Sequence, residues 1–143
     1  MKAKKLTAPQ VREVLRKIQF AKLLDVRLTA LHRDGLTLEC AARKELLNSA
    51  GVLHGGVSAT LADAASGVAL HYLLGGHRPI TTVEMKINYF RPVSNGRIFA
   101  RAHMLRTGAT LCVARVDIID EMRKLVGAAL VTYMILPGGG HAS

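Results

Sequence analysis

The sequence predicts an α+β domain in which a mostly antiparallel sheet curls around one long helix. A segment from residue 46 to 77 of the 143-residue chain carries a single formally charged side chain, Asp63, and its middle has helical spacing. Short runs with period-two alternation follow this segment. An Asp-Gly pair separates two further runs before it, which is a strong hairpin signal. The order helix, hairpin, long helix and four strands is typical of a two-layer domain.

The first elements are a helix and a hairpin. Apolar residues recur at helical spacing from Pro9 to about Leu24, which predicts one amphipathic helix. Strands are then expected over Val26–His32 and Leu36–Ala42, joined by the turn Arg33-Asp34-Gly35. The first eight residues and the tail from Gly138 to Ser143 are expected to be loose.

The long helix is predicted from about Gly55 to Leu74. At 100° per residue, one stripe holds the larger residues Val57, Leu61, Ala64, Val68 and Tyr72. The opposite side holds the small or polar residues Ala59, Ala62, Asp63 and Ser66. A solvated helix face is normally rich in Lys and Glu, so we expect packing against both sides, with the sheet on one and a partner on the other.

Four strands are expected after this helix, as a meander. Their ranges are Thr82–Phe90, Arg97–Leu105, Thr110–Ile119 and Lys124–Leu136. In the first of them the apolar residues Val83, Met85, Ile87 and Tyr89 alternate with the polar residues Thr82, Glu84, Lys86 and Asn88.

Composition limits the function classes. The net charge is +10, but the basic residues are scattered and few aromatic residues accompany them, which argues against a nucleic-acid-binding protein. No signal peptide or membrane span is predicted, and we expect a cytoplasmic protein. Neither a zinc pattern, nor a nucleotide-binding glycine loop, nor a Gly-x-Ser-x-Gly elbow occurs. We expect one domain over residues 1–143, with an ordered core at about 9–137, and no metal or redox cofactor.

One motif carries the functional interpretation. An Asn at position 48 is followed by the run His54-Gly55-Gly56 and, within the predicted helix, by Asp63. This arrangement closely resembles the hotdog-fold acyl-CoA thioesterases of the phenylacetate-degradation (PaaI) and thioesterase-superfamily-member type. The resemblance extends from about Val11 to Leu136 and includes the strand and turn over residues 82–92. It implies a hotdog fold, an antiparallel sheet wrapped around a long central helix.

The chemistry of the motif agrees with that resemblance. Gly55 opens the helix, where backbone N–H groups are unpaired and the helix dipole is positive. Its N–H is therefore our candidate for polarising a thioester carbonyl and holding the oxyanion. His54 is expected to orient this loop or the thioester. Asp63 is a carboxylate in a nearly charge-free segment, expected to be poorly solvated. The resemblance implies that it acts as nucleophile or general base.

The spacing has a consequence for assembly. Gly55 and Asp63 are eight residues apart, or about 12 Å of helix rise. One thioester carbonyl must lie roughly 3 Å from both the oxyanion donor and the attacking group. One helix cannot supply both groups, so the site needs two subunits. The resemblance implies the same homodimer, usually within a homotetramer that is a dimer of dimers.

Further site residues are carried over from the resemblance. Asn48 matches the family's site Asn, which positions water or the neighbouring chain's Asp. Thr82 matches a hydroxyl position on the third strand, where Ser is often found. Gly56 is expected to contact substrate. For coenzyme A the resemblance points to the turns after the third and fourth strands, where Arg91, Arg106, Thr107 and Gly108 lie.

The predicted function is therefore an enzyme that hydrolyses an acyl-CoA to a free acid and coenzyme A. The main alternative is a hotdog protein that binds acyl-CoA without catalysis and regulates transcription. A separate DNA-binding element, which such a regulator needs, is not evident here. A hotdog dehydratase or hydratase is a second alternative, and the His-Gly-Gly…Asp pattern argues against it. A mobility-shift assay on DNA tests the first, and activity on an enoyl thioester tests the second.

Overall fold

The computed structural model describes residues 3–76 and 78–138. The N-terminal elements are helices α1 and α2 and strands β1 and β2, at Ala8–Arg16, Gln19–Leu23, Arg27–His32 and Gly35–Ala41. A short 3₁₀ helix, η1 (Lys44–Leu46), leads to the long helix α3 (Gly55–Leu74). The remaining strands β3, β4, β5 and β6 are Ile80–Tyr89, Arg97–Thr107, Leu111–Asp120 and Leu125–Ile135.

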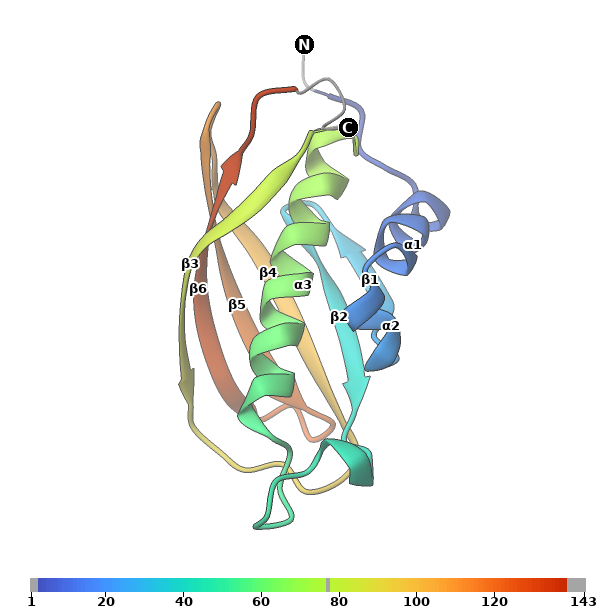
Figure 1. Cartoon of the computed structure of the whole chain (residues 1–143), viewed down its shortest axis with the longest axis vertical. Coiled ribbons are helices and arrows are strands. Elements are labelled where there is room, and N and C mark those ends of the chain that lie inside the picture. The colour runs from blue at the N-terminus through green and yellow to red at the C-terminus, as the bar shows by residue number, and fades with distance from the viewer. Residues whose placement is uncertain (1–2, 77, 139–143) are drawn as a thin grey trace.

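The six strands form one antiparallel sheet in the order β1-β2-β4-β5-β6-β3. The sheet curls around α3, while α1 and α2 cover the β1–β2 side of that helix (Figure 1). This arrangement confirms the α+β class and the predicted hairpin at Asp34-Gly35, because β1 and β2 pair antiparallel across it.

The predicted four-strand meander is wrong in one respect. Of the four strands that follow α3, only β4, β5 and β6 are neighbours in chain order, whereas β3 pairs with β6 at the far edge of the sheet. After β3 the chain crosses below the N-terminal end of α3, where the Leu53 N–H donates to the Val93 carbonyl at 2.6 Å, and then enters beside β2. Turn residues mark where a strand ends, but they do not determine which strand lies beside it.

The single N-terminal helix predicted at Pro9–Leu24 is also wrong. It breaks at Ile18, whose backbone is extended, with φ −84° and ψ 98°. The Lys17 and Ile18 N–H groups bond three residues back, which tightens and ends the first helix. The break lets the second helix bury Ala21 against α3 while Phe20 stays 56% exposed.

The expectation of loose termini is partly wrong. Among the described residues before α1, Leu6 donates its N–H to the Tyr72 carbonyl at 3.1 Å and packs against the core. Residues 1–2, residue His77 and the tail after Gly138 lie outside the described residues.

Helix α3 has the predicted bounds, and Gly75 ends it in the left-handed conformation (φ 78°). The buried face is rotated slightly from the predicted stripe, because Ala62 and Ser66 are fully buried and Ala64 is not. The Ser66 hydroxyl is satisfied by the Ala62 carbonyl at 2.9 Å. By length and composition α3 could cross a membrane, but 56% of its apolar window is buried in this fold, as in a core helix.

The start of β2 allows a specific stability prediction. A Cβ on Gly35 would lie 2.0 Å from the Ala102 carbonyl oxygen of β4. Gly35→Ala therefore forces the β2–β4 backbones apart, and we expect the free energy of unfolding to fall by about 2 kcal/mol or more in a urea titration. Gly138→Ala is the control, since a Cβ there meets nothing within 4 Å. Equal urea midpoints for the two variants would contradict the prediction.

The β1–β2 turn is also tied to β4 by charge. Arg101 donates to the Asp34 carboxylate, and His103 lies 3.1 Å from it. The Arg101 hydrogen bond is the main reason that the pKa of Asp34 falls from its usual 3.8 to about 2. Because the folded-state pKa is the lower one, this stabilisation is fully present above about pH 4 and is lost as the pH falls toward 2.

Asp34→Asn should accordingly be less stable at neutral pH, and its stability should fall less steeply than that of the wild type between about pH 4 and 2. The measurement is urea unfolding at a series of pH values. Since the Asp34 side chain is half exposed, the effect should be small and should weaken with salt. Parallel curves for wild type and variant would show that the pair does not stabilise the fold.

Candidate active site

The N-terminal end of α3 presents one unpaired amide. His54 is the N-cap residue, and its ring Nδ1 accepts from the Gly56 N–H at 2.9 Å. The Val57 N–H is taken by the His54 carbonyl, also at 2.9 Å. Within the described residues the Gly55 N–H has no partner. Since the helix dipole is positive here, this N–H is the available donor for a developing oxyanion.

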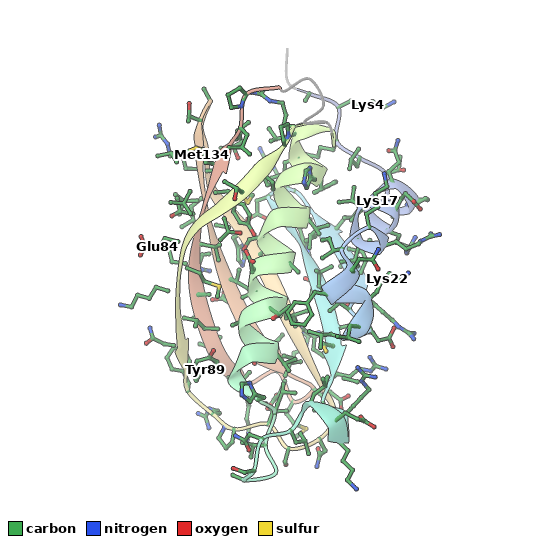
Figure 2. All side chains as sticks on the ribbon, in the orientation of Figure 1. Lys4, Lys17, Lys22, Glu84, Tyr89 and Met134 are labelled. Atoms are coloured by element: carbon green, nitrogen blue, oxygen red, sulfur yellow. The ribbon has the colours of Figure 1, made fainter. Side chains whose placement is uncertain are left out.

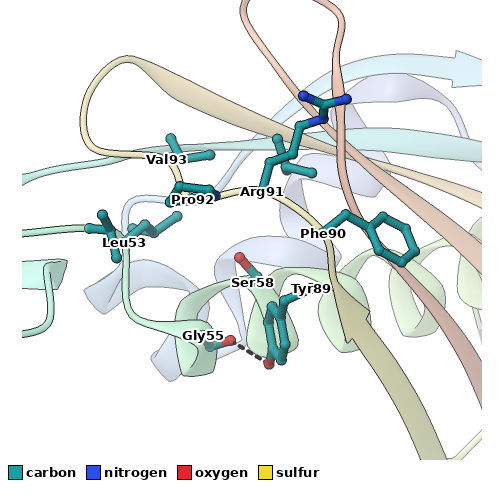
Figure 3. Close-up of a pocket in the computed structure, with 10 residues that line it drawn as sticks. Leu53, Gly55, Ser58, Tyr89, Phe90, Arg91, Pro92 and Val93 are labelled. Atoms are coloured by element: carbon teal, nitrogen blue, oxygen red, sulfur yellow. Dashed lines mark hydrogen bonds between the residues drawn. The ribbon is translucent and has the colours of Figure 1, made fainter. Parts of the chain in front are cut away.

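A hollow of about 290 Å³ opens beside that amide, lined by Gly55, Ser58 and the segment from Tyr89 to Val93 among others (Figure 3). Tyr89 fixes the first turn, because its hydroxyl donates to the Gly55 carbonyl at 2.9 Å. A Cβ on Gly55 would lie 3.1 Å from the Tyr89 ring. Glycine thus lets the ring and the helix end pack closely. Arg91 lies at the rim, with its guanidinium group pointing away from Gly55 (Figure 3).

The second group of predicted residues gathers around Asp63. The Thr82 hydroxyl of β3 donates to Asp63 Oδ1 at 2.9 Å. The Tyr133 hydroxyl of β6 donates to the same oxygen and also lies 2.6 Å from the Asp63 main-chain carbonyl. Within the described chain, hydrogen bonds reach Oδ1 only, so Oδ2 is unengaged. Three elements therefore fix one carboxylate and leave one of its oxygens available.

A β-bulge explains how Thr82 reaches Asp63. Strict alternation would turn Thr82 outward together with Glu84, as the sequence pattern predicts. In β3, however, the pairing with β6 shifts between Thr82 and Glu84, and Val83 is the extra residue. Thr82 therefore pairs with Tyr133, which faces the core, and shares its side of the sheet. Bulges often re-aim a side chain next to an active site.

Asp63 lines a mainly apolar hollow of about 240 Å³ between α3, the α1–α2 segment and the ends of β3 and β6. It is partly exposed, so it is better solvated than its charge-free neighbourhood suggested. His71 lies in the same hollow, where burial lowers the pKa of its ring. The His71 Nδ1 atom is buried and has no hydrogen-bond partner in the described part of the chain.

The two halves of the predicted site do not meet within one chain. Gly55 and Asp63 lie eight residues apart on one continuous helix and line different hollows. Asn48 is exposed in the loop before α3, where its Oδ1 accepts from the Ala50 and Val52 N–H groups at 2.9 and 3.2 Å. The side-chain oxygen of Asn48 thus fixes the shape of the loop, and its side-chain NH₂ group has no hydrogen-bond partner among the described residues.

The residues predicted for coenzyme A are also separated. Arg91 lies in the connection that follows β3, near Gly55, whereas Arg106, Thr107 and Gly108 lie at the far end of β4. An 11-residue strand spans roughly 33 Å, so these groups flank opposite ends of the sheet in one chain.

Two tyrosines at the site were missed from the sequence. Tyr133 follows Asp63 by 70 positions, and its only sequence signal is a polar aromatic residue on the inward face of an apolar strand. Tyr89 was recognised only as one member of an alternating strand. Residues 3–76 and 78–138 contain no group of three or more His, Cys, Asp or Glu side chains that could hold a metal ion. The absence of a cofactor stays a prediction.

Comparison with known proteins identifies the family. The model of the thioesterase superfamily matches residues 50–126. Acyl-coenzyme A thioesterase 13 of Mus musculus is 35% identical over 115 residues, which are 78% of this chain and 81% of that protein.

Solved structures agree with this match. A thioesterase from Haemophilus influenzae has a TM-score of 0.89 at 25% identity, covering 100% of both chains. A mutant of the phenylacetic acid degradation protein PaaI from Thermus thermophilus has a TM-score of 0.74 at 27% identity, covering 82% of this chain and 99% of that one. The predicted hotdog fold is confirmed, and the chain is a thioester hydrolase that belongs to the thioesterase superfamily.

Proposed function

We propose that the protein is an acyl-CoA thioesterase, which hydrolyses a coenzyme A thioester to the free acid and coenzyme A. The observation that carries this proposal is the Asp63 carboxylate, held through Oδ1 by two hydroxyl donors and unengaged at Oδ2, beside an apolar hollow. This arrangement suits a group that must attack a thioester carbonyl or activate water next to an acyl chain. No metal or redox cofactor is required, because a thiolate leaves readily.

The chemistry divides between the two groups. The Gly55 N–H binds the thioester carbonyl oxygen and stabilises the negative charge that develops there. In the general-base form, a water oxygen bonds to the carbonyl carbon while Asp63 takes its proton. The C–S bond then breaks, the acid forms, and the proton passes to the thiolate. In the nucleophilic form, Asp63 bonds to the carbonyl carbon first, and the C–S bond breaks to give a mixed anhydride and the coenzyme A thiolate. Water later cleaves the anhydride, which releases the acid, restores the Asp63 carboxylate and supplies the proton that the thiolate takes up.

We propose that the complete site forms between two copies of the chain. Strand β3 is an end strand, so one edge of its ten-residue backbone is unpaired within the described chain. Antiparallel pairing of two β3 strands would run the two α3 helices in opposite directions. The Gly55 end of one helix would then reach the level of Asp63 on the other. We also propose, from the family resemblance alone, that two such dimers associate into a tetramer.

The same two-fold arrangement accounts for the separated coenzyme A residues. With the helices reversed, Arg91 of one copy lies toward the sheet end that carries Arg106, Thr107 and Gly108 of the other. The basic surface supports this role, since Arg suits charge-assisted contacts to phosphates. Other lysines, such as Lys4, Lys17 and Lys22, point outward on the far α1–α2 side (Figure 2). We assign these to solubility in a cytoplasmic protein.

The first test is the release of free thiol from benzoyl-, octanoyl- and palmitoyl-CoA, with wild type beside Asp63→Asn. We expect the wild type to turn over one class and the variant to lose at least about 100-fold in kcat while remaining an intact oligomer. If the wild type binds these thioesters but cleaves none above background, the protein is a non-catalytic acyl-CoA-binding hotdog protein instead.

A second test asks whether two copies share the site. Asp63→Asn and Gly55→Ala should each be inactive alone, the latter because its methyl group crowds Tyr89 and the oxyanion position. When an equimolar mixture is dissociated and reassociated, half of the dimers contain one copy of each variant. Each mixed dimer has two sites, and in one of them both Asp63 and Gly55 are native. Activity should return to about a quarter of the wild-type value. A mixture that stays inactive, although mixed dimers form, would place both groups of each site in one chain.

A further inference from the structure

The hydrogen bonds at Asp63 distinguish its two oxygens. Thr82 and Tyr133 both donate to Oδ1, whereas the described residues donate nothing to Oδ2. A carboxylate oxygen that accepts two donors has fewer lone-pair directions left and holds its charge more tightly. The chemically competent oxygen is therefore Oδ2.

Tyr133 has the properties of a fixed donor. Its side chain is 4% exposed and comes from the inward face of β6, near the C-terminal end of that strand. Burial, followed by the charge of Asp63, raises the pKa of Tyr133 far above its ordinary value. The phenol therefore keeps its proton throughout the working pH range and cannot serve as the base. Its single proton favours the carboxylate over the neutral Asp63 carbonyl, because an ionised acceptor makes the stronger bond.

Glycine at position 67 makes this contact possible. A Cβ on Gly67 would lie 3.1 Å from the Tyr133 hydroxyl oxygen and 3.4 Å from the ring carbon that bears it. Position 67 is one helical turn after Asp63, on the same partly exposed side of α3. The small residue thus admits the phenol to the helix surface just where the carboxylate can accept from it.

We infer that Tyr133 is a positioning residue for the reaction, which together with Thr82 holds Asp63 by Oδ1 and so selects Oδ2 as the oxygen that reacts. This inference rests on the proposed thioesterase function. It assigns a role to a residue that does not touch the substrate and that lies outside the sequence motif.

The other groups around Asp63 define the controls. The titratable side chains that line this hollow in the described chain are Tyr133 from β6 and His71 from α3. The α1–α2 segment contributes only Ile18, Phe20 and Ala21, and β3 contributes Ile80 there, with Thr82 bonded to the carboxylate. None of these five residues titrates in the working range. Among these side chains, only His71 can add its own titration to a pH profile measured at this site.

The test is Tyr133→Phe, measured as kcat, KM and the pH profile of kcat/KM on the best acyl-CoA of the panel. We expect kcat to fall about 10- to 100-fold, as for loss of a hydrogen bond to a charged group, with KM changed less than about twofold. The low-pH inflection of the kcat/KM profile should also move upward, because the variant removes a hydrogen bond that is strongest when its acceptor is charged. Thr82→Ala should act in the same direction, and Thr82→Ser should restore it.

Two controls are matched to this variant. Tyr72→Phe also removes a buried tyrosine hydroxyl, which donates to the His32 carbonyl at 3.1 Å and does not touch Asp63, so it should retain wild-type kcat. His71→Gln should leave the low-pH inflection in place. If Tyr133→Phe fails to fold, Gly67→Ala displaces the phenol from the opposite direction and should give the same pair of changes.

The outcomes separate this inference from the proposed function. A wild-type kcat and an unmoved inflection in Tyr133→Phe would overturn the positioning role while Asp63→Asn still abolishes activity. A fall in kcat with an unmoved inflection would reduce Tyr133 to a structural residue and also overturn the inference. Absence of any thioesterase activity in the wild type would instead remove the proposed function itself.

Discussion

The whole architecture depends on keeping the surface of α3 out of water. This 20-residue helix carries one formally charged side chain, and ten of its residues are buried. No single layer can cover such a helix all round, so six strands curl about it and two short helices close one flank. The side left partly open holds small residues, and there a carboxylate can meet a ligand. Core packing and the location of the site thus follow from the same constraint.

The helix also acts as a rigid spacer. Its first turn contains one N–H, at Gly55, that has no partner among the described residues, whereas the N–H groups of the next two residues donate to His54. Its middle carries a carboxylate that two strands hold by hydrogen bonds. Neither group depends on a mobile loop, since each is fixed by packing and hydrogen bonds. Preorganised groups of this kind lose little free energy to rearrangement when charge develops. In the proposed mechanism, the carbonyl is polarised at the helix end and attacked at mid-helix.

Much of this could be predicted from sequence because the signals are local. The bounds of α3 follow from a nearly charge-free apolar segment that ends in glycine, and the β1–β2 hairpin follows from Asp34-Gly35. What could not be predicted is non-local. The place of β3 at the sheet edge depends on a crossover, and the break at Ile18 depends on the packing of Ala21. The contact of Tyr133 with Asp63 joins positions 70 residues apart, and no spacing rule reports it.

The bulge at Val83 changes which residues of β3 face inward on its two sides. Downstream of it, Met85 and Ile87 face the core at odd-numbered positions. Upstream, the inward residue is the even-numbered Thr82, opposite Tyr133 in the stretch of β6 (127–135) whose alternation is unbroken. One extra residue therefore separates the demands of packing from those of chemistry. The apolar part of the strand can change size to suit the core without turning the hydroxyl away from the carboxylate. If Val83 were instead paired opposite a residue of β6 in a regular ladder, Thr82 and Met85 would face opposite sides of the sheet, and either the hydroxyl or the apolar run would turn toward solvent.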